Sequence, residues 1–306
     1  MLTVVLAITA STAIGVGAER RFGAGAFRAC RLLIDLTVWL VLPFVVFFIA
    51  GDLDLGGGVG IGLLAGYVVV AIVGLCAHQA GTRLLRLSRP QVGALICGVI
   101  LANTGYLGIP LNGALLGHSA LGPAIAWDTV VSQVALYGAA FAVGAAFGER
   151  AGESRAERIK AFLTRNPVLY ALIAGLLAPE SITPHALVEI ARTLAYMLLP
   201  VGFFILGVNL MGGEERGAWR LPPPLSREVA LAGSLRMVMA PALVAALAAP
   251  LGGVPDAYIL QAAMPTGINS LVVAHLYGLD VRLTASIVAW TTLASIVTAP
   301  LLAAVL

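Results

Sequence analysis

Charged residues are scarce in this sequence. Asp, Glu, Lys and Arg make up 11% of its 306 residues, whereas hydrophobic residues make up 60% and the mean hydropathy is +0.99. A soluble domain carries about 25% charged residues, because it must cover a surface that faces water. The scarcity therefore excludes a soluble globular protein and predicts an all-α integral membrane protein, whose exterior must be apolar to contact lipid.

Cysteines are also scarce, and two common motifs for metal and nucleotide binding are absent. The three cysteines, Cys30, Cys76 and Cys97, are odd in number and lie in apolar or juxtamembrane segments. Their spacing predicts neither a disulfide framework nor a metal site. The sequence has no HExxH motif and no Walker phosphate-binding motif, so we expect no cofactor, no metal and no ATP-driven pumping by this chain alone.

Ten apolar runs are long enough, or nearly so, to cross a membrane, which takes about 20 helical residues. They cover roughly 3–18, 29–50, 58–80, 91–116, 120–147, 167–183, 186–211, 228–249, 255–277 and 281–304. No basic residue precedes the first run, so we expect a transmembrane helix there and not a removable signal peptide. The longest polar connection, 148–165, leaves five runs on each side.

The basic residues indicate an orientation. Sixteen of the 18 Lys and Arg residues fall in or beside alternate connections, and the intervening ones carry Asp52, Asp54, Glu180 and Asp256. The basic residues in question are Arg20, Arg21, Arg28, Arg31, Arg83, Arg86, Arg89, Arg150, Arg155, Arg158, Lys160, Arg165, Arg216, Arg220, Arg227 and Arg282. The positive-inside rule then predicts cytoplasmic arginine-rich connections and both termini outside.

The two halves of the chain resemble each other. Residues 39–53 read WLVLPFVVFFIAGDL, and 196–210 read YMLLPVGFFILGVNL. One constant offset pairs Trp39, Pro43, Phe47, Ala50, Asp52 and Leu53 with Tyr196, Pro200, Phe204, Gly207, Asn209 and Leu210. The same offset takes Asn112 to Asn269. Coincidence among apolar residues is the alternative, but five helices per half would orient the halves oppositely, as in many transporters. We therefore predict repeats at 1–147 and 166–306, joined by the cytoplasmic connection 148–165.

Two runs combine Gly, Pro, Asn and Thr near their middle. They are ILANTGYLGIPLNG at 100–113 and LQAAMPTGINSL at 260–271. Proline removes a backbone donor and clashes with the preceding turn, so each helix is expected to kink or unwind there. The amides at the start of each second half-helix would carry partial positive charge and could seat a carboxylate. Close helix packing is the alternative for one such run, whereas two at corresponding places favour a site.

Four segments resemble the auxin efflux carrier family, which includes the plant PIN carriers and bacterial organic-anion transporters. They are NTGYLGIPL, NPVLYALIAGLL, LPVGFFILGVNL and AMPTGINSLVVA. The resemblance implies ten helices in two inverted five-helix repeats, with a scaffold domain and a moving transport domain. It also implies that helices four and nine are broken and cross at Pro110 and Pro265. The substrate-binding residues expected from this crossing are Asn103, Thr104, Gly105, Pro110, Asn112, Pro265, Thr266 and Asn269.

The chain departs from that family in two respects. It lacks the long central loop of the plant carriers. Its third run carries only His78 near the cytoplasmic end, where those carriers have a charged Asp or Lys support site. The resemblance therefore implies neither their charge mechanism nor auxin as a substrate for this chain.

Ionisable groups at membrane depth are costly and so point to function. Asp128 is a candidate coupling residue or a hydrated interfacial carboxylate, and Gln133 lies about 140° away from it on an α-helix. Arg236 is expected to snorkel to the cytoplasm. Arg192 is expected to pair locally with Glu189. Gln261, His275 and Asn209 could line a cavity or join helices by hydrogen bonds.

These patterns predict a multi-pass secondary transporter of the plasma (inner) membrane, carrying a small organic anion such as a carboxylate by alternating access. A sodium-coupled symporter of similar fold is the alternative. An intramembrane aspartyl protease using Asp35 and Asp128 ranks lower, since no GxGD sequence is present. A membrane sensor without transport is a third interpretation. The expected partners are the anion, membrane lipid and either a proton or sodium. A homodimer is left open, and no nucleic acid is expected.

Overall fold

The computed structural model describes residues 2–51, 60–151, 155–164, 167–211, 223, 225–251 and 253–305. These residues form helices joined by turns, with one isolated β-bridge between Ala102 and Thr266. Five helical stretches among them are long and apolar enough to cross a membrane. They are Ala24–Gly51, Gly62–Leu84, Leu121–Phe147, Arg227–Ala248 and Val281–Thr298. The all-α membrane class is confirmed.

The helices follow the predicted apolar ranges. The first half contains α1 Leu2–Phe22, α2 Ala24–Leu36, α3 Leu42–Gly51, α4 Gly60–Gln79, α5 Arg89–Ile100, α6 Ile109–Leu115, α7 Leu121–Ala126 and α8 Phe141–Phe147. The second half contains α9 Arg155–Thr164, α10 Pro167–Leu176, α11 His185–Met211, α12 Arg227–Ser234, α13 Ala240–Ala248, α14 Asp256–Ala262, α15 Asn269–Tyr277 and α16 Val281–Val305. Helix α9 occupies the connection 148–165, which the sequence predicted only as polar. Asp52, Asp54 and most residues around Pro222–Pro224 lie outside the described residues.

Several helices contain π-helical turns, in which each N–H bonds the carbonyl five residues earlier, and three of these turns stand just before a proline. They are Thr37–Val41 before Pro43, Thr104–Gly108 before Pro110, and Leu235–Met239 before Pro241. Proline clashes with the carbonyl four residues before it in a regular α-helix. The wider turn absorbs the clash, so each helix continues through its proline.

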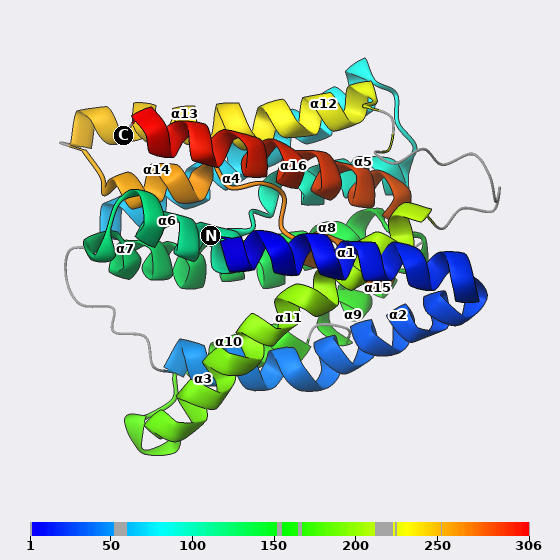
Figure 1. Cartoon of the computed structure of the whole chain (residues 1–306), viewed down its shortest axis with the longest axis horizontal. Helices are drawn as coiled ribbons and strands as arrows, with labels where there is room; N and C mark the ends of the chain where they lie inside the picture. Colours follow the sequence, from blue (N-terminus) through cyan, green and yellow to red (C-terminus); the bar gives the residue numbers. More distant parts are fainter. Residues whose placement is uncertain are drawn as a thin grey trace.

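The helices form two packed groups (Figure 1). Helices α1, α2, α3, α10 and α11 make one group, in which α1 packs along α11 and α10 packs along α3. Helices α4–α8 and α12–α16 make the other, with a buried core around Leu95, Tyr137 and Tyr277. Contacts between α11 and α16 join the groups.

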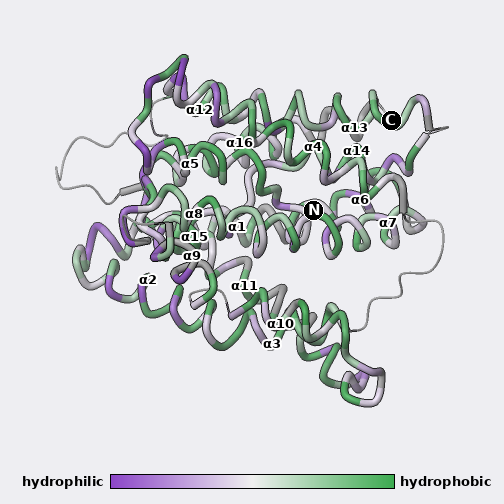
Figure 2. The backbone as a smooth tube through the Cα atoms, turned by 180° about the vertical axis from the view of Figure 1, so that it is seen from behind, coloured by the Kyte–Doolittle hydropathy of each residue, from purple (hydrophilic) through white to green (hydrophobic). Residues whose placement is uncertain are grey.

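The ends of the helices are arranged by charge. The α1–α2 connection and the starts of α5, α12 and α16 lie at one end of the molecule, on the right in Figure 1. These are the arginine-rich segments of the sequence, and hydrophilic backbone gathers at the same end (Figure 2). The α6–α7, α10–α11 and α13–α14 connections lie at the opposite, arginine-poor end.

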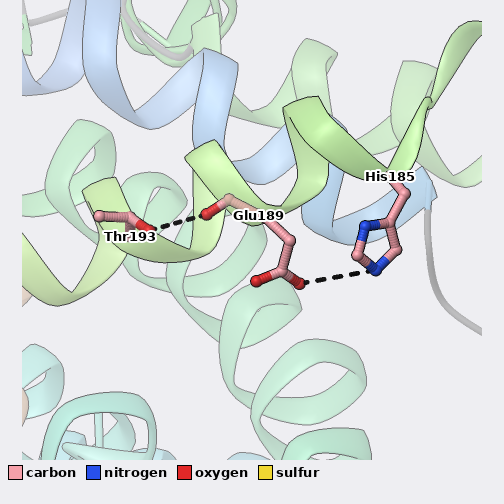
Figure 3. A network of polar contacts seen from close by, with 3 residues as sticks. All are labelled: His185, Glu189 and Thr193. Atoms are coloured by element: carbon pink, nitrogen blue, oxygen red, sulfur yellow. Dashed lines mark hydrogen bonds and ion pairs between the residues drawn. The ribbon is translucent and has the colours of Figure 1, made fainter.

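The α10–α11 connection leads into a short polar network at the start of α11 (Figure 3). His185 Nε2 lies 4.0 Å from Glu189 Oε1, and Thr193 Oγ1 donates a 2.9 Å hydrogen bond to the Glu189 carbonyl. Glu189 therefore has a partner one turn before it, whereas the side chain of Arg192, its predicted partner, is not described. Both side chains are exposed, so the contact contributes little to stability.

Glycines bring two helix pairs into backbone contact. A methyl group on Gly15 of α1 would overlap the carbonyl oxygen of Phe204 in α11, and one on Gly207 would overlap that of Thr12. In the other pair, a methyl on Gly175 of α10 would overlap the carbonyl oxygen of Phe47 in α3. Small residues allow such close approach in membranes.

Substituting valine for Gly15 is expected to destabilise the protein. The added side chain must push α1 and α11 apart, and overpacking of this kind costs about 1–3 kcal/mol or more. The measurement is the thermal midpoint in detergent. Gly17→Val is the matched control, because a methyl on Gly17 meets no atom within 4 Å. Equal midpoints for the two variants would contradict this account of the contact.

Candidate functional site

Two broken helices cross in the middle of the second helix group. Helix α5 ends at Ile100 and the chain resumes helical structure at Thr104, while α14 ends at Ala262 and α15 begins at Asn269. The unwound segments pair with each other. Asn103 N donates to Pro265 O at 2.7 Å, and Gly267 N donates to Leu101 O at 2.9 Å. Backbone groups released from both helices thus satisfy one another, as membrane burial requires.

The position of the first break corrects the prediction from Pro110. The helix opens at Leu101–Asn103, and Pro110 lies in the first turn of α6, beyond the break. The π-helical turn before Pro110 removes the clash that was expected to open the helix. Pro265, by contrast, lies in the unwound segment, and its carbonyl takes part in the crossing.

Side chains hold the carbonyl ends of the two first half-helices. Thr266 Oγ1 donates to Gly98 O at 2.6 Å, and Thr266 N donates to Thr291 Oγ1 of α16 at 3.1 Å. The Arg236 guanidinium donates to Val99 O at 3.0 Å and to Ala262 O. Arg236 is 3% exposed, so the prediction that it snorkels to the cytoplasm is wrong. A buried cationic side chain therefore lies at the crossing.

A cavity of about 460 Å³ lies on the other side of the crossing. The starts of both second half-helices line it, at Thr104–Gly105 and Ile268–Asn269. Its wall also includes residues of α3 between Leu42 and Ala50, Leu198 of α11, and residues of the segment that begins with α7. The cavity therefore lies between the two helix groups. The described residues of the wall include no Lys, Arg or His.

Polar groups in the cavity wall include Asp128 and Asn103. Asp128 Oδ1 accepts a 2.5 Å hydrogen bond from Thr104 Oγ1, and a methyl group on Gly105 would lie 3.4 Å from the same oxygen. The carboxyl therefore lies at the amino end of the half-helix that begins with Thr104. Asn103 is 3% exposed, and its Nδ2 finds no acceptor among the described residues. The Asn103 Nδ2 is thus a buried donor without a described partner, on a residue of the cavity wall.

Gln133 lies beside Asp128, contrary to the α-helical prediction. Its Nε2 donates to Asp128 Oδ2 at 3.4 Å. The reason is that Trp127–Ser132 is a π-helical turn, whose five-residue hydrogen-bond spacing brings residues i and i+5 to nearly the same face. The α-helical period assumed from the sequence would have placed the two side chains on different faces.

The predicted site residues fall into two sets. Asn103, Thr104, Gly105, Asn269, Asp128 and Gln133 line the cavity. Pro110, Asn112, Pro265 and Thr266 do not line it. Asn112 is fully buried, with its Nδ2 bonded to Gly108 O in its own helix at 2.8 Å. Asn269, which the repeat offset pairs with Asn112, begins α15 and lines the cavity, whereas Asn112 lies within α6.

The remaining polar candidates join helices or bond their own turns. Gln261 Nε2 donates to Ala124 O at 2.8 Å and so links α14 to α7. Asn209 Nδ2 bonds Ile205 O, and His275 Nδ1 lies 2.9 Å from Leu271 O. Asp35 is exposed on α2 and does not reach the cavity that Asp128 lines, so the two carboxyls form no protease dyad.

Sequence reasoning missed the contacts of Arg236 and the place of Tyr106 in the cavity wall. A usable signal existed for Arg236. It is one of only two basic residues that lie outside the arginine-rich connections. Snorkelling residues are expected in or beside those connections. No comparable signal marked Tyr106, because a tyrosine in an apolar run is more often part of the core.

Comparison with known proteins adds two findings. Residues 154–303, about half of the chain, match the sequence model of a family described as membrane transport protein. The chain is also 23% identical over 288 residues to "Uncharacterized transporter MJ1031" of Methanocaldococcus jannaschii, a match that covers 89% of this chain and 88% of that protein. The family match extends across the second broken helix, α14–α15.

Proposed function

Because the chain belongs to the membrane transport protein family, which is the auxin efflux carrier family, we propose that it is a secondary transporter of a small organic anion. It binds a carboxylate in the cavity at the crossing and moves it by alternating access. The observation that carries this proposal is the opening of two half-helix amino ends, at Thr104 and Asn269, into one cavity.

The chemistry of the cavity suits an anion held by neutral donors. The first amides of a helix have no partner within the helix, and the helix dipole adds about half a positive charge at that end. Two such ends, with the Asn103 Nδ2 that has no acceptor among the described residues, provide donors without a cationic side chain. Apolar side chains of α3, such as Val46, would contact the rest of the substrate.

Asp128 supplies a reason for proton coupling. It already lies at one of the two amino ends, bonded to Thr104. An ionised Asp128 would compete with the substrate carboxylate, since two negative charges about 4 Å apart repel by about 4 kcal/mol at an effective dielectric constant of about 20. Protonated Asp128 would not repel it. The substrate and one proton therefore bind together, and release of one favours release of the other.

The proposed architecture has ten spans in two inverted repeats. The glycine contacts support it, because Phe204 and Phe47, which the repeat offset equates, each meet a glycine of a helix from the other half. In this arrangement α1–α3 with α10–α11 form the scaffold, and the group that contains the crossing moves past it. Both termini lie outside the cell, and the connection that contains α9 lies in the cytoplasm.

The transport proposal is tested by counterflow in proteoliposomes. The purified protein is reconstituted and loaded in turn with members of a panel of monocarboxylates, dicarboxylates and aromatic acids. Entry of the matching labelled acid, above the level in protein-free liposomes, is the expected result for at least one acid. Failure of every anion, together with uptake of a neutral or cationic solute, would overturn the proposed substrate class.

The orientation has its own test in intact cells. In a background with Cys30, Cys76 and Cys97 replaced, Lys160→Cys should react with a membrane-impermeant thiol reagent only after the cells are opened. His185→Cys is the matched control on the other side and should react in intact cells. Both side chains are exposed, so access to the reagent depends on the side of the membrane alone. Labelling of Lys160→Cys from outside would reverse the topology.

A further inference from the structure

Arg236 lies at the crossing but outside the cavity wall. Its guanidinium contacts Val99 O in the last turn of α5 and Ala262 O at the last residue of α14. It does not line the cavity, which is formed by the opposite ends of the crossing. One buried cation therefore contacts the carboxyl ends of both first half-helices, and the cavity opens onto the amino ends of both second half-helices.

The charge of Arg236 is balanced by backbone and not by a carboxylate. Its hydrogen bonds go to two carbonyl oxygens, and it forms no ion pair with any acid that the structure describes. The last carbonyls of a helix lack partners within the helix and carry about half a negative charge together. Two such ends meeting at one point attract a positive charge strongly in a membrane interior, where little water can screen it.

In carriers built from broken helices, unwound carbonyls and half-helix carboxyl ends are the groups that coordinate Na⁺. We propose that the Arg236 guanidinium is a tethered substitute for such a coupling cation. It fills the carbonyl-lined place at the crossing permanently, and the crossing therefore binds no sodium ion.

Two consequences follow from a cation that cannot leave. The two carbonyl ends stay bound to α12–α13 throughout the transport cycle, so the crossing moves together with these helices. Sodium cannot supply the driving force at this place, which leaves the coupling role to a group on the cavity side. The proposal concerns the cation alone and does not depend on which anion is carried.

The first test compares two substitutions of similar length in the purified protein. Arg236→Lys keeps a positive charge, whereas Arg236→Gln keeps hydrogen-bond donors without one. We expect the thermal midpoint of the glutamine variant to fall by roughly 5 °C or more, and that of the lysine variant to fall clearly less. The control pair, Arg227→Lys and Arg227→Gln, changes an exposed arginine of α12 and should show no such difference. A glutamine variant as stable as the lysine variant would overturn the proposal.

The second test replaces the tethered cation by a free one. Methylguanidinium, added during extraction and purification, should raise the thermal midpoint of Arg236→Ala with a saturable dependence and leave that of the wild type unchanged. Sodium, exchanged for choline at constant ionic strength, should leave the wild type unchanged. Two results would overturn the proposal. One is an equal response of the wild type and Arg236→Ala to methylguanidinium. The other is a saturable rise of the wild-type thermal midpoint with sodium that Arg236→Lys abolishes. Neither measurement uses a transport substrate. A negative result here therefore does not bear on the proposed anion transport, which the counterflow assay tests separately.

Discussion

The Asp128→Asn variant is expected to lose accumulation of substrate driven by a proton gradient while keeping substrate exchange. Asparagine resembles the protonated carboxyl in shape and carries no charge, so the variant remains in the form that accepts the anion. Exchange needs no net proton movement and should continue. Accumulation requires the carboxyl to gain and lose its proton in each cycle, which asparagine cannot do.

The sign of the pH effect follows from the same competition. Lower pH outside protonates Asp128 when it faces that side and so favours binding of the anion there. Wild-type protein should therefore take up substrate faster when the outer side is made more acidic than the lumen. The measurement is uptake of the labelled anion into proteoliposomes, first under an imposed pH gradient and then under exchange conditions without one.

Asp35→Asn is the matched control for this experiment. It makes the same chemical change on an exposed face of α2, away from the cavity, and should behave as the wild type does. Gradient-driven accumulation by Asp128→Asn would remove Asp128 from the coupling role. A wild type that ignores pH would remove proton coupling altogether, and a response to sodium would then favour the sodium-coupled alternative.

Leucine at Asn103 or Asn269 is expected to weaken substrate binding by about tenfold or more. Both residues line the cavity, and Asn103 Nδ2 is buried without an acceptor among the described residues. Loss of one buried hydrogen bond to a charged group costs about 1–3 kcal/mol, and about 1.4 kcal/mol corresponds to tenfold in affinity. The measurement is the concentration dependence of exchange, with the amount of folded protein determined by size-exclusion chromatography.

Asn112→Leu is the comparison that separates the cavity from the rest of the crossing. The Nδ2 of the Asn112 side chain donates to Gly108 O of its own helix, and the buried Oδ1 has no partner among the described residues. Leucine has the same branching as asparagine and removes that unsatisfied acceptor, so apparent affinity should stay close to the wild-type value. A large loss of affinity in Asn112→Leu, with Asn103→Leu unaffected, would move the binding site away from this cavity.

The interruption of two helices could be predicted from sequence, but the place of the first one could not. The pattern of Gly, Pro and Asn marked both runs correctly. It misplaced the first break at Pro110, because a proline clash can be relieved by a π-helical turn such as Thr104–Gly108. The Asp128–Gln133 contact was missed for the same reason, since a local change of helical period moves a side chain to another face.

Hydropathy and the distribution of arginines determined the membrane class, the helix ranges and the grouping of arginine-rich connections at one end. These properties depend on the transfer of single segments into lipid, which composition describes well. The tertiary structure alone decided which buried polar groups meet. The sequence around Arg236 predicts a snorkelling residue. In the structure its guanidinium is buried and donates hydrogen bonds to carbonyls of α5 and α14. Those carbonyls are free only because two helices distant in sequence unwind at the same point, which no single segment encodes.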